Sequence, residues 1–241
     1  MRLLTVERVG KRFGGVAALN EVSLEIETGE MVGLMGANGA GKTTLFNLIA
    51  CSERPSAGAI HFEGRRVDLL RPDQVARRGI ARTFQIVRPF RNLTVGENVR
   101  IGALFGSDTG RPDDGDAFAR EVLAEVGLEQ QAGIFAGSLT LSGQKRLEIA
   151  RALAQRPRLL LLDEVMAGLT PKEVADAIAM IRRIKTKHRL TILLVEHVLS
   201  AMMTLCERII VLHHGRKIAE GPPETVARDP RVLEAYLGRP S

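Results

Sequence analysis

The sequence has few aromatic side chains and few cysteines. Of its 241 residues none is tryptophan, one is tyrosine, and aromatic residues make up only 4%. Proteins that bind single-stranded nucleic acid stack bases on aromatic side chains, so this scarcity argues against such an activity. The two cysteines, Cys51 and Cys206, cannot form a disulfide framework. Both occur in apolar helical patterns, and we expect them to be buried thiols.

Long hydrophobic runs are also missing. No run approaches the roughly 18 apolar residues that a membrane-spanning helix needs. The longest, at 159–162 and 192–195, have the length of buried strands. Residues 1–8 contain no apolar segment of the kind found in signal peptides. We therefore expect the chain to stay in the cytoplasm unless a partner holds it at a membrane.

The remaining composition is typical of a globular protein with a basic bias. Hydrophobic residues make up 45% and charged residues 26%, which excludes a wholly disordered chain. The length allows one large domain or two small ones. A formal net charge of +6 favours anionic partners, among them nucleotides, lipid headgroups and nucleic acids.

Periodicity predicts strands that alternate with helices. Strands are expected at 22–26, 30–35, 60–62, 159–162 and 191–195, with a hairpin of 209–212 and 217–219 around Gly215. Helices are expected at 42–51, 117–126, 144–155, 170–187 and 198–206, and a capping-box pattern at 94–97 begins another. A Gly/Asp/Pro-rich loop is expected at 108–116. This alternation predicts an α/β fold with a mostly parallel sheet, in which residues 88–156 form a helical insert.

One segment has the spacing of a phosphate-binding loop. The pattern G-x-x-x-x-G-K-[ST] is matched by Gly36-Ala37-Asn38-Gly39-Ala40-Gly41-Lys42-Thr43. Glycines let backbone N–H groups turn toward phosphate oxygens, and the helix that follows directs its positive end at the anion. Lys42 would reach the β- and γ-phosphates, and the Thr43 hydroxyl would ligate Mg²⁺. A simple glycine-rich turn is the alternative interpretation.

Polar residues follow two of the predicted strands. Asp163 and Glu164 come directly after 159–162, at the strand end where α/β sheets bind ligands. Asp163 would bind Mg²⁺, and Glu164 would orient and polarise a water for attack on the γ-phosphate. Glu196 and His197 follow the strand at 191–195 in the same way. A lone histidine there is more often structural, and His197 gains a function only from the resemblance described next.

These residues resemble the ATP-binding subunit of an ATP-binding-cassette (ABC) transporter, and the resemblance covers essentially the whole chain. Arg82-Thr83-Phe84-Gln85 is similar to the glutamine loop of that family, and His197 stands where its switch histidine belongs. Phe13 stands where an aromatic ring stacks on adenine. The resemblance implies a P-loop NTPase (RecA-like) core of residues 1–87 and 157–241, an antiparallel β subdomain, and a helical subdomain at 88–156, all within one domain.

Within the family the sequence most resembles importer ATPases for branched-chain or other hydrophobic amino acids. This likeness lies in the glutamine loop and in three further segments, at 146–151, 195–197 and 234–238. The lipopolysaccharide-export ATPase shares a similar tail and remains an alternative.

The family signature Leu-Ser-Gly-Gly-Gln is not intact. An ungapped match, which we prefer, gives Leu139-Thr140-Leu141-Ser142-Gly143, in which Thr140 supplies the hydroxyl; allowing one deletion, the match becomes Leu141-Ser142-Gly143-Gln144. Val165 stands where a proline usually follows the glutamate, and Thr170 replaces the aspartate of the D-loop. These departures affect segments that couple two subunits and leave the hydrolytic residues present.

The resemblance also implies a set of site residues, with ATP and Mg²⁺ as cofactors. The residues expected to act in catalysis are Lys42, Gln85, Glu164 and His197. Those expected to bind the nucleotide are Phe13, Gly36, Asn38, Gly39, Ala40, Gly41, Lys42, Thr43, Thr44, Thr140, Ser142, Gly143 and Gln144. Those expected to hold the metal are Thr43, Gln85 and Asp163.

The expected partners are two transmembrane permease subunits, a second ABC ATPase that is identical or related, and indirectly a substrate-binding protein. Nucleic acid is not expected to bind, and the location would be the cytoplasmic face of the plasma (inner) membrane. Three alternatives remain besides the export ATPase: a non-transport ABC ATPase of DNA repair or translation, a P-loop kinase, and a regulatory subunit that only binds nucleotide.

Overall fold

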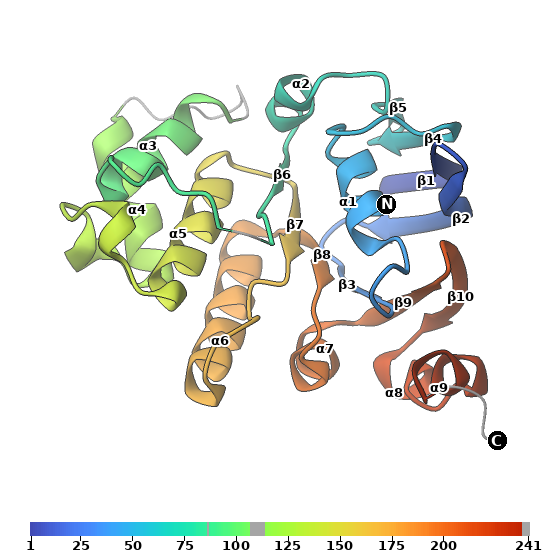
Figure 1. Cartoon of the computed structure of the whole chain (residues 1–241). Helices are drawn as coiled ribbons and strands as arrows, with labels where there is room; N and C mark the ends of the chain where they lie inside the picture. Colours follow the sequence, from blue (N-terminus) through green and yellow to red (C-terminus); the bar gives the residue numbers. More distant parts are fainter. Residues whose placement is uncertain (86, 107–113, 238–241) are drawn as a thin grey trace. The chain divides into compact units, whose positions relative to one another are not determined.

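The computed structural model of the chain describes residues 1–85, 87–106 and 114–237 (Figure 1). It divides into two compact units, one formed by Met1–Pro72 with Thr191–Ser241 and the other by Asp73–Leu190. The helical insert expected at 88–156 lies inside the second unit. In the described part of the chain no helix combines the length and the hydropathy that a membrane span requires.

The first unit contains an antiparallel sheet with the strand order β2-β1-β4-β5. Its strands are β1 (Arg2–Phe13), β2 (Val16–Glu27), β4 (Ala57–Phe62) and β5 (Arg65–Arg66). Val6 of β1 lies opposite Leu24 of β2 and Ile60 of β4, and all three are buried. Alternate residues of each strand therefore pack on one face, as the alternation at 22–26 predicted.

A second group of strands in this unit is ordered β10-β9-β3-β8. Strand β3 (Met31–Met35) pairs in parallel with β8 (Thr191–Val195) and β9 (Arg208–His213). Strand β10 (Arg216–Gly221) pairs with β9 in an antiparallel hairpin, as predicted. Every residue of β8 is buried, which is why its sequence is continuously apolar instead of alternating.

Four helices complete the first unit: α1 (Lys42–Ile49), α7 (Leu199–Leu205), α8 (Pro223–Val226) and α9 (Pro230–Leu237). Helices α8 and α9 both pack against β10. The helix predicted at 42–51 is two residues longer than α1, and neither α8 nor α9 was predicted.

The two cysteines correct one detail of the sequence analysis. Cys51 follows α1 with a left-handed backbone (φ 54°), and Cys206 is the C-cap of α7, so neither lies within a helix. Both thiols are buried, as expected. Burial raises the pKa of Cys51 to about 11 and that of Cys206 to about 12, so both thiols stay protonated at neutral pH.

The second unit combines two strands with a group of helices. Strands β6 (Ile80–Arg82) and β7 (Leu159–Asp163) pair in parallel, with Ile80 opposite Leu159. The helices are α2 (Pro72–Arg77, which begins at the last residue of the first unit), α3 (Val95–Leu104), α4 (Gly115–Val126), α5 (Leu141–Ala154) and α6 (Pro171–His188). Short 3₁₀ turns at Glu129–Gln131 and Ala136–Ser138 connect α4 to α5.

Local sequence signals explain where these helices begin and end. Thr94 and Glu97 form a capping box at α3, and Thr170 and Glu173 form one at α6, with a proline in the first turn. Gly127 ends α4 in the left-handed conformation. The helix predicted to begin at the capping-box pattern of 94–97 is confirmed, and so are the predicted end of a helix at 126 and the start of another at about 170. Helix α5 begins three residues earlier than predicted, at Leu141. The loop predicted at 108–116 lies mostly outside the described residues, and its last two residues belong to α4.

Candidate functional site

The predicted phosphate-binding loop connects β3 to α1 in the first unit. Gly36, Gly39 and Gly41 have positive φ values of 153°, 79° and 102°. A Cβ at Gly41 would lie 2.7 Å from the carbonyl oxygen of Ala18, so only glycine fits there. As N-cap of α1, Gly41 has no side chain to accept the first backbone N–H groups, and the first turn has no acidic residue. This helix end therefore suits an anion.

The Lys42 side chain is bonded to the backbone of this loop. It is only 7% exposed, and its Nζ donates to the carbonyl oxygens of Gly36 (2.6 Å) and Ala37 (3.1 Å). These bonds hold the ammonium over the residues whose backbone would surround a phosphate. Of the other predicted contacts, Asn38, Gly39 and Thr43 are exposed, Thr44 is half-buried, and Ala40 is buried.

One residue at the loop was missed by the sequence analysis. Tyr236, near the end of α9, hydrogen-bonds with the backbone of Gly36. Burial raises the pKa of its hydroxyl above the usual value, and the bond with Gly36 opposes part of this rise. No spacing signal links the two residues, because 200 positions separate them in the sequence.

Two further predicted residues lie in the first unit. His197 follows β8 and is exposed, directly after the buried Glu196. Phe13 is the last residue of β1, with 47% of its surface exposed and the Lys11 ammonium 4.7 Å from its ring centroid. An exposed ring at the end of a hairpin strand is sterically available for stacking.

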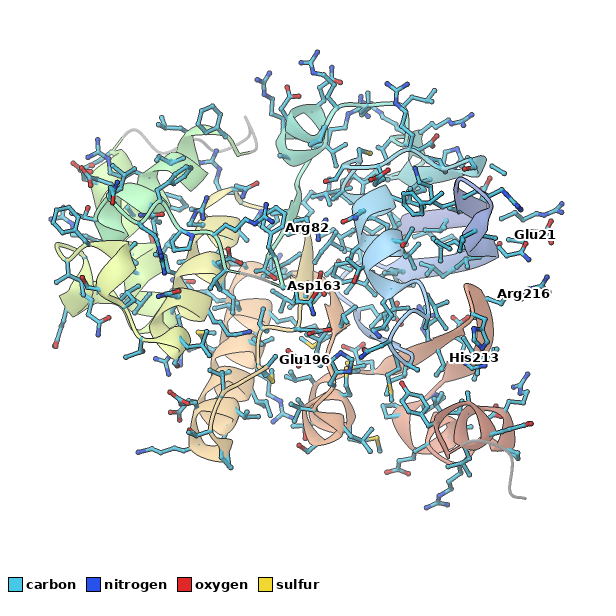
Figure 2. The ribbon with its side chains drawn as sticks, viewed as in Figure 1. Glu21, Arg82, Asp163, Glu196, His213 and Arg216 are labelled. Atoms are coloured by element: carbon cyan, nitrogen blue, oxygen red, sulfur yellow. The ribbon has the colours of Figure 1, made fainter. Side chains whose placement is uncertain are left out.

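In the second unit Asp163 ends β7 and is 1% exposed. Its backbone N–H donates to Thr83 Oγ1 (3.0 Å), and Nη2 of Arg82 lies 3.5 Å from its Oδ2; Figure 2 labels both Arg82 and Asp163. Burial lowers the pKa of Arg82, and the Asp163 carboxylate opposes this shift. Arg82 belongs to the segment that resembles the glutamine loop, and nothing in its sequence indicated this ion pair.

Glu164 and Gln85, which the resemblance to the family assigned to catalysis, contact each other. The Gln85 Nε2 donates to Glu164 Oε2 at 2.8 Å. Glu164 is 9% exposed and has a left-handed backbone (φ 51°), and its carbonyl oxygen accepts a 2.6 Å hydrogen bond from Lys145 Nζ. Lys145 was not among the predicted site residues.

The degenerate signature segment forms the beginning of α5. Thr140 is the N-cap, and its Oγ1 accepts the backbone N–H of Gly143 at 3.2 Å. Gln144 Nε2 donates to the carbonyl oxygen of Leu139, and the Ser142 hydroxyl hydrogen-bonds to Glu173. A hydroxyl at the N-cap satisfies a backbone N–H group of the first turn, which explains why the helix begins here.

Helix α5 also anchors the segment that contains Gln85. The buried Glu148 carboxylate accepts the backbone N–H groups of Phe84 (3.0 Å) and Arg88 (2.7 Å). Arg151, one turn further along, donates to the carbonyl oxygen of Arg88 at 2.8 Å. The loop bearing Gln85 is thus held by two side chains of α5 that the sequence analysis did not single out for this purpose.

Comparison with known proteins identifies the family. A model described as ABC transporter matches residues 19–167, and one described as branched-chain amino acid ATP-binding cassette transporter matches residues 216–240. The chain belongs to the ABC transporter family. The ATP-binding subunits of such transporters hydrolyse ATP, so this ABC subunit is an ATPase.

Its relatives are ATP-binding proteins of similar length. The high-affinity branched-chain amino acid transport protein BraF of Pseudomonas aeruginosa is 39% identical over 98% of both chains, and LivG of Escherichia coli has the same identity and coverage. The lipopolysaccharide export protein LptB of Haemophilus influenzae is 34% identical over 99% of this chain and 98% of its own.

Solved structures bear out the P-loop NTPase fold. A nucleotide-free ATP-binding cassette from an ABC transporter has a TM-score of 0.90 at 30% identity, covering 99% of this chain and all 100% of its own. A dimeric cassette in a post-hydrolysis state, bound to ADP and Pi, has a TM-score of 0.81 at 28% identity, covering 92% of this chain and 99% of its own. The family and these structures are those of ABC transporter proteins, and they give no support to the alternative of a P-loop kinase.

The donor atoms of this ABC subunit fit Mg²⁺. In residues 1–85, 87–106 and 114–237 no cluster of three or more His, Cys, Asp and Glu side chains is arranged to hold a metal. Mg²⁺ needs no such cluster, because one or two protein oxygens combine with waters and substrate phosphates. The Thr43 hydroxyl and the Asp163 carboxylate are hard oxygen donors of this kind.

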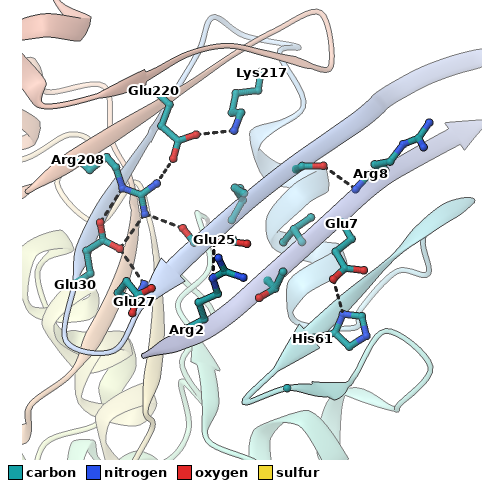
Figure 3. A pocket seen from close by; sticks show the side chains of 15 residues that line it. Arg2, Glu7, Arg8, Glu25, Glu27, Glu30, His61, Arg208, Lys217 and Glu220 are labelled. Carbon is teal, nitrogen blue, oxygen red and sulfur yellow. Dashed lines mark hydrogen bonds and ion pairs between the residues drawn. The ribbon is translucent and has the colours of Figure 1, made fainter.

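The first unit also contains a concavity of about 1080 Å³, which is lined largely by charged side chains. Arg208 pairs there with Glu30 (2.8 Å) and with Glu220, which also pairs with Lys217 (Figure 3). Arg208 also donates to the carbonyl oxygen of Glu25 at 2.7 Å. Arg208 of β9 is thus paired with a carboxylate just before β3 and with one on β10, and it is also bonded to the backbone of β2, so this network stabilises the contact between these segments.

Proposed function

We propose that this ABC subunit hydrolyses ATP to power import of branched-chain or other hydrophobic amino acids through separate permease subunits, at the cytoplasmic face of the membrane. The observation that carries the ATPase assignment is the glycine loop whose carbonyls hold Lys42, followed by an uncapped helix end. The match at 216–240 and the relatives BraF and LivG support the amino-acid class.

In this proposal the residues that match the motifs of the family act on one ATP. The loop amides and Lys42 bind the phosphates, and Phe13 stacks on the adenine. Glu164 orients and polarises the attacking water, Gln85 holds the Glu164 carboxylate, and His197 contacts the γ-phosphate. The water oxygen bonds to the γ-phosphorus as the bond to the β-phosphate oxygen breaks, giving ADP and phosphate. Mg²⁺, held by Thr43, Gln85 and Asp163, would neutralise charge on the phosphates.

A second subunit completes the pair in this proposal. The segment of Thr140, Ser142, Gly143 and Gln144 at the start of α5 faces the nucleotide of the partner ATPase, which is either identical or related. ATP binding closes the pair and hydrolysis reopens it. Closure drives the permease subunits, to which a substrate-binding protein delivers the amino acid.

The permease docks, we infer, in an apolar groove of the second unit. This groove of about 360 Å³ is lined by Phe84, Phe90 and Phe105, all exposed, together with Arg82 and Arg151. The guanidinium groups of Arg82 and Arg151 lie 4.8 Å from the ring centroids of Phe84 and Phe90, respectively. These cation–π contacts hold the two rings in position. Because Phe84 adjoins Gln85, a permease helix seated here would act directly on the residue that bonds Glu164.

The docking proposal is tested by membrane co-purification with the permease. Phe90→Ala should lose the permease while retaining nucleotide binding, since it removes an exposed anchor. Phe135→Ala is the matched control, because Phe135 is 60% exposed in the same unit but does not line the groove. Equal recovery of permease with both variants would refute the assigned surface.

The ATPase assignment is tested with two substitutions. Glu164→Gln should bind ATP normally and hydrolyse it about 10²–10⁴-fold more slowly, the range expected for loss of a general base. Lys42→Ala should lose nucleotide affinity. Glu224→Gln, at an exposed position of α8, is the control for removal of a carboxylate and should behave as wild type. Native turnover in the Glu164 variant would contradict its role.

The transport assignment is tested with the assembled transporter in vesicles. ATP-dependent uptake of leucine, isoleucine or valine, abolished by Glu164→Gln, is the expected result. ATPase stimulation by lipopolysaccharide with no amino-acid uptake would instead favour the export function of LptB.

A further inference from the structure

Glu164 is held in an unusual backbone conformation. Its φ of 51° lies in the left-handed region, which is unfavourable for a residue with a Cβ atom. Such a conformation persists only where the surroundings hold it. The direction of the Glu164 carboxylate therefore depends on whatever fixes its backbone.

The Lys145 ammonium fixes that backbone. Its Nζ donates to the Glu164 carbonyl oxygen at 2.6 Å, and the two residues are 7% and 9% exposed. The Ala167 N–H also bonds this oxygen, at the longer distance of 3.3 Å. A hydrogen bond from a charged donor in a buried setting is stronger than one between neutral groups. The lysine thus makes the shorter and stronger of these two contacts.

Lys145 lies on the same helix as the signature segment. It lies in the second turn of α5, whose N-cap is Thr140. One rigid helix therefore carries the signature segment at its N-terminus and a side chain bonded to the Glu164 backbone. A shift at the start of α5 would be transmitted to Glu164 through this ammonium.

We propose that Lys145 is a positioning residue for ATP hydrolysis, which orients Glu164 and reports to it the state of the signature segment. The inference rests on the proposed function, because Glu164 matters only if it acts on water. In this proposal Lys145 acts through Glu164 and is assigned no contact with substrate.

The test compares variants of Lys145 in the complex with its permease. Lys145→Met keeps the length of the side chain but has no donor, and kcat should fall about 10- to 100-fold, the effect of a small misplacement of a catalytic group. ATP affinity should stay unchanged, and Lys145→Arg, which keeps a donor, should recover most of the rate. Lys172→Met, at an exposed lysine of α6, is the matched control.

A double-mutant cycle separates positioning from a purely structural role. If Lys145 acts through Glu164, then Lys145→Met should cause no further loss in the Glu164→Gln background. Wild-type turnover in Lys145→Met, or a full additional loss in the double variant, would overturn the proposal. If Lys145→Met does not fold, Lys145→Gln, whose amide is too short to reach, takes its place in the cycle. A wild-type complex without ATPase activity would overturn the proposed function, and this inference with it.

Discussion

Gly41 and Gly39 offer a matched pair for testing how the phosphate-binding loop is built. Both have left-handed φ values, 102° and 79°, so alanine at either position carries a similar backbone strain, about 1–2 kcal/mol. Their surroundings differ. A Cβ at Gly41 would lie 2.7 Å from the Ala18 carbonyl oxygen and from Leu19 Cδ2, whereas a Cβ at Gly39 meets nothing within 4 Å.

The clash at Gly41 is expensive because one of the atoms it meets belongs to the backbone of β2. Relieving it requires a shift of a paired strand, and overpacking of this kind costs roughly 1–3 kcal/mol. Gly41→Ala should therefore lower the free energy of unfolding by about 2–5 kcal/mol, against about 1–2 kcal/mol for Gly39→Ala. A protein with a stability of about 10 kcal/mol, the middle of the ordinary range, should still fold in both cases.

Urea denaturation of the nucleotide-free chain, followed by circular dichroism, measures this difference. The midpoint for Gly41→Ala should lie well below that for Gly39→Ala at an unchanged slope. ATP affinity should also fall further in Gly41→Ala, because the shifted loop presents its amides differently. Equal midpoints for the two variants would refute the argument that contact with β2, and not φ alone, requires glycine at position 41.

Two further substitutions probe buried carboxylates. Glu148→Gln replaces one acceptor oxygen with a donor, so one of the two N–H groups of Phe84 and Arg88 loses its partner, at a cost of about 1–3 kcal/mol. Hydrogen exchange at those two amides should then quicken by about 10- to 100-fold, and unchanged exchange would mean that Glu148 does not hold the loop. Asp68 is buried, which raises its pKa, but bonds from Arg66 and from the Ile60 N–H outweigh this and hold it below the usual value. Since the folded pKa is the lower one, its stabilisation is present above about pH 4 and disappears as the pH falls through the folded value. Asp68→Asn should therefore be less stable than wild type at pH 7, and the gap should narrow toward pH 2 in urea titrations; a gap independent of pH would contradict this.

The features that the sequence determined are those encoded by contiguous residues. The phosphate-binding loop needs glycines, a lysine and a threonine at fixed spacing, and a capping box needs only Thr170 and Glu173. Such signals involve residues within one or two turns of the chain, so they can be recognised before the fold is known. The buried strands β7 and β8 were predicted for the same reason, since burial on both faces demands an unbroken apolar run.

Some of the elements that escaped prediction are very short. Helix α2 has 6 residues and strand β6 has 3, which is too few for a period to be recognised. Strand β6 is stabilised by its pairing with β7. Helix α5 begins earlier than predicted because Thr140 is its N-cap. The unusual signature gave no indication of this role.

Only the tertiary structure decided which distant side chains meet. Lys145 reaches Glu164 across 19 residues, Glu148 reaches Phe84 across 64, and Gln85 reaches Glu164 across 79. Each of these bonds joins a helix or loop to another segment, and its residues share no local period. The sequence therefore specified the chemistry of the ATPase, while the packing of α5 beside β7 and the Gln85 segment decided how its carboxylate is held.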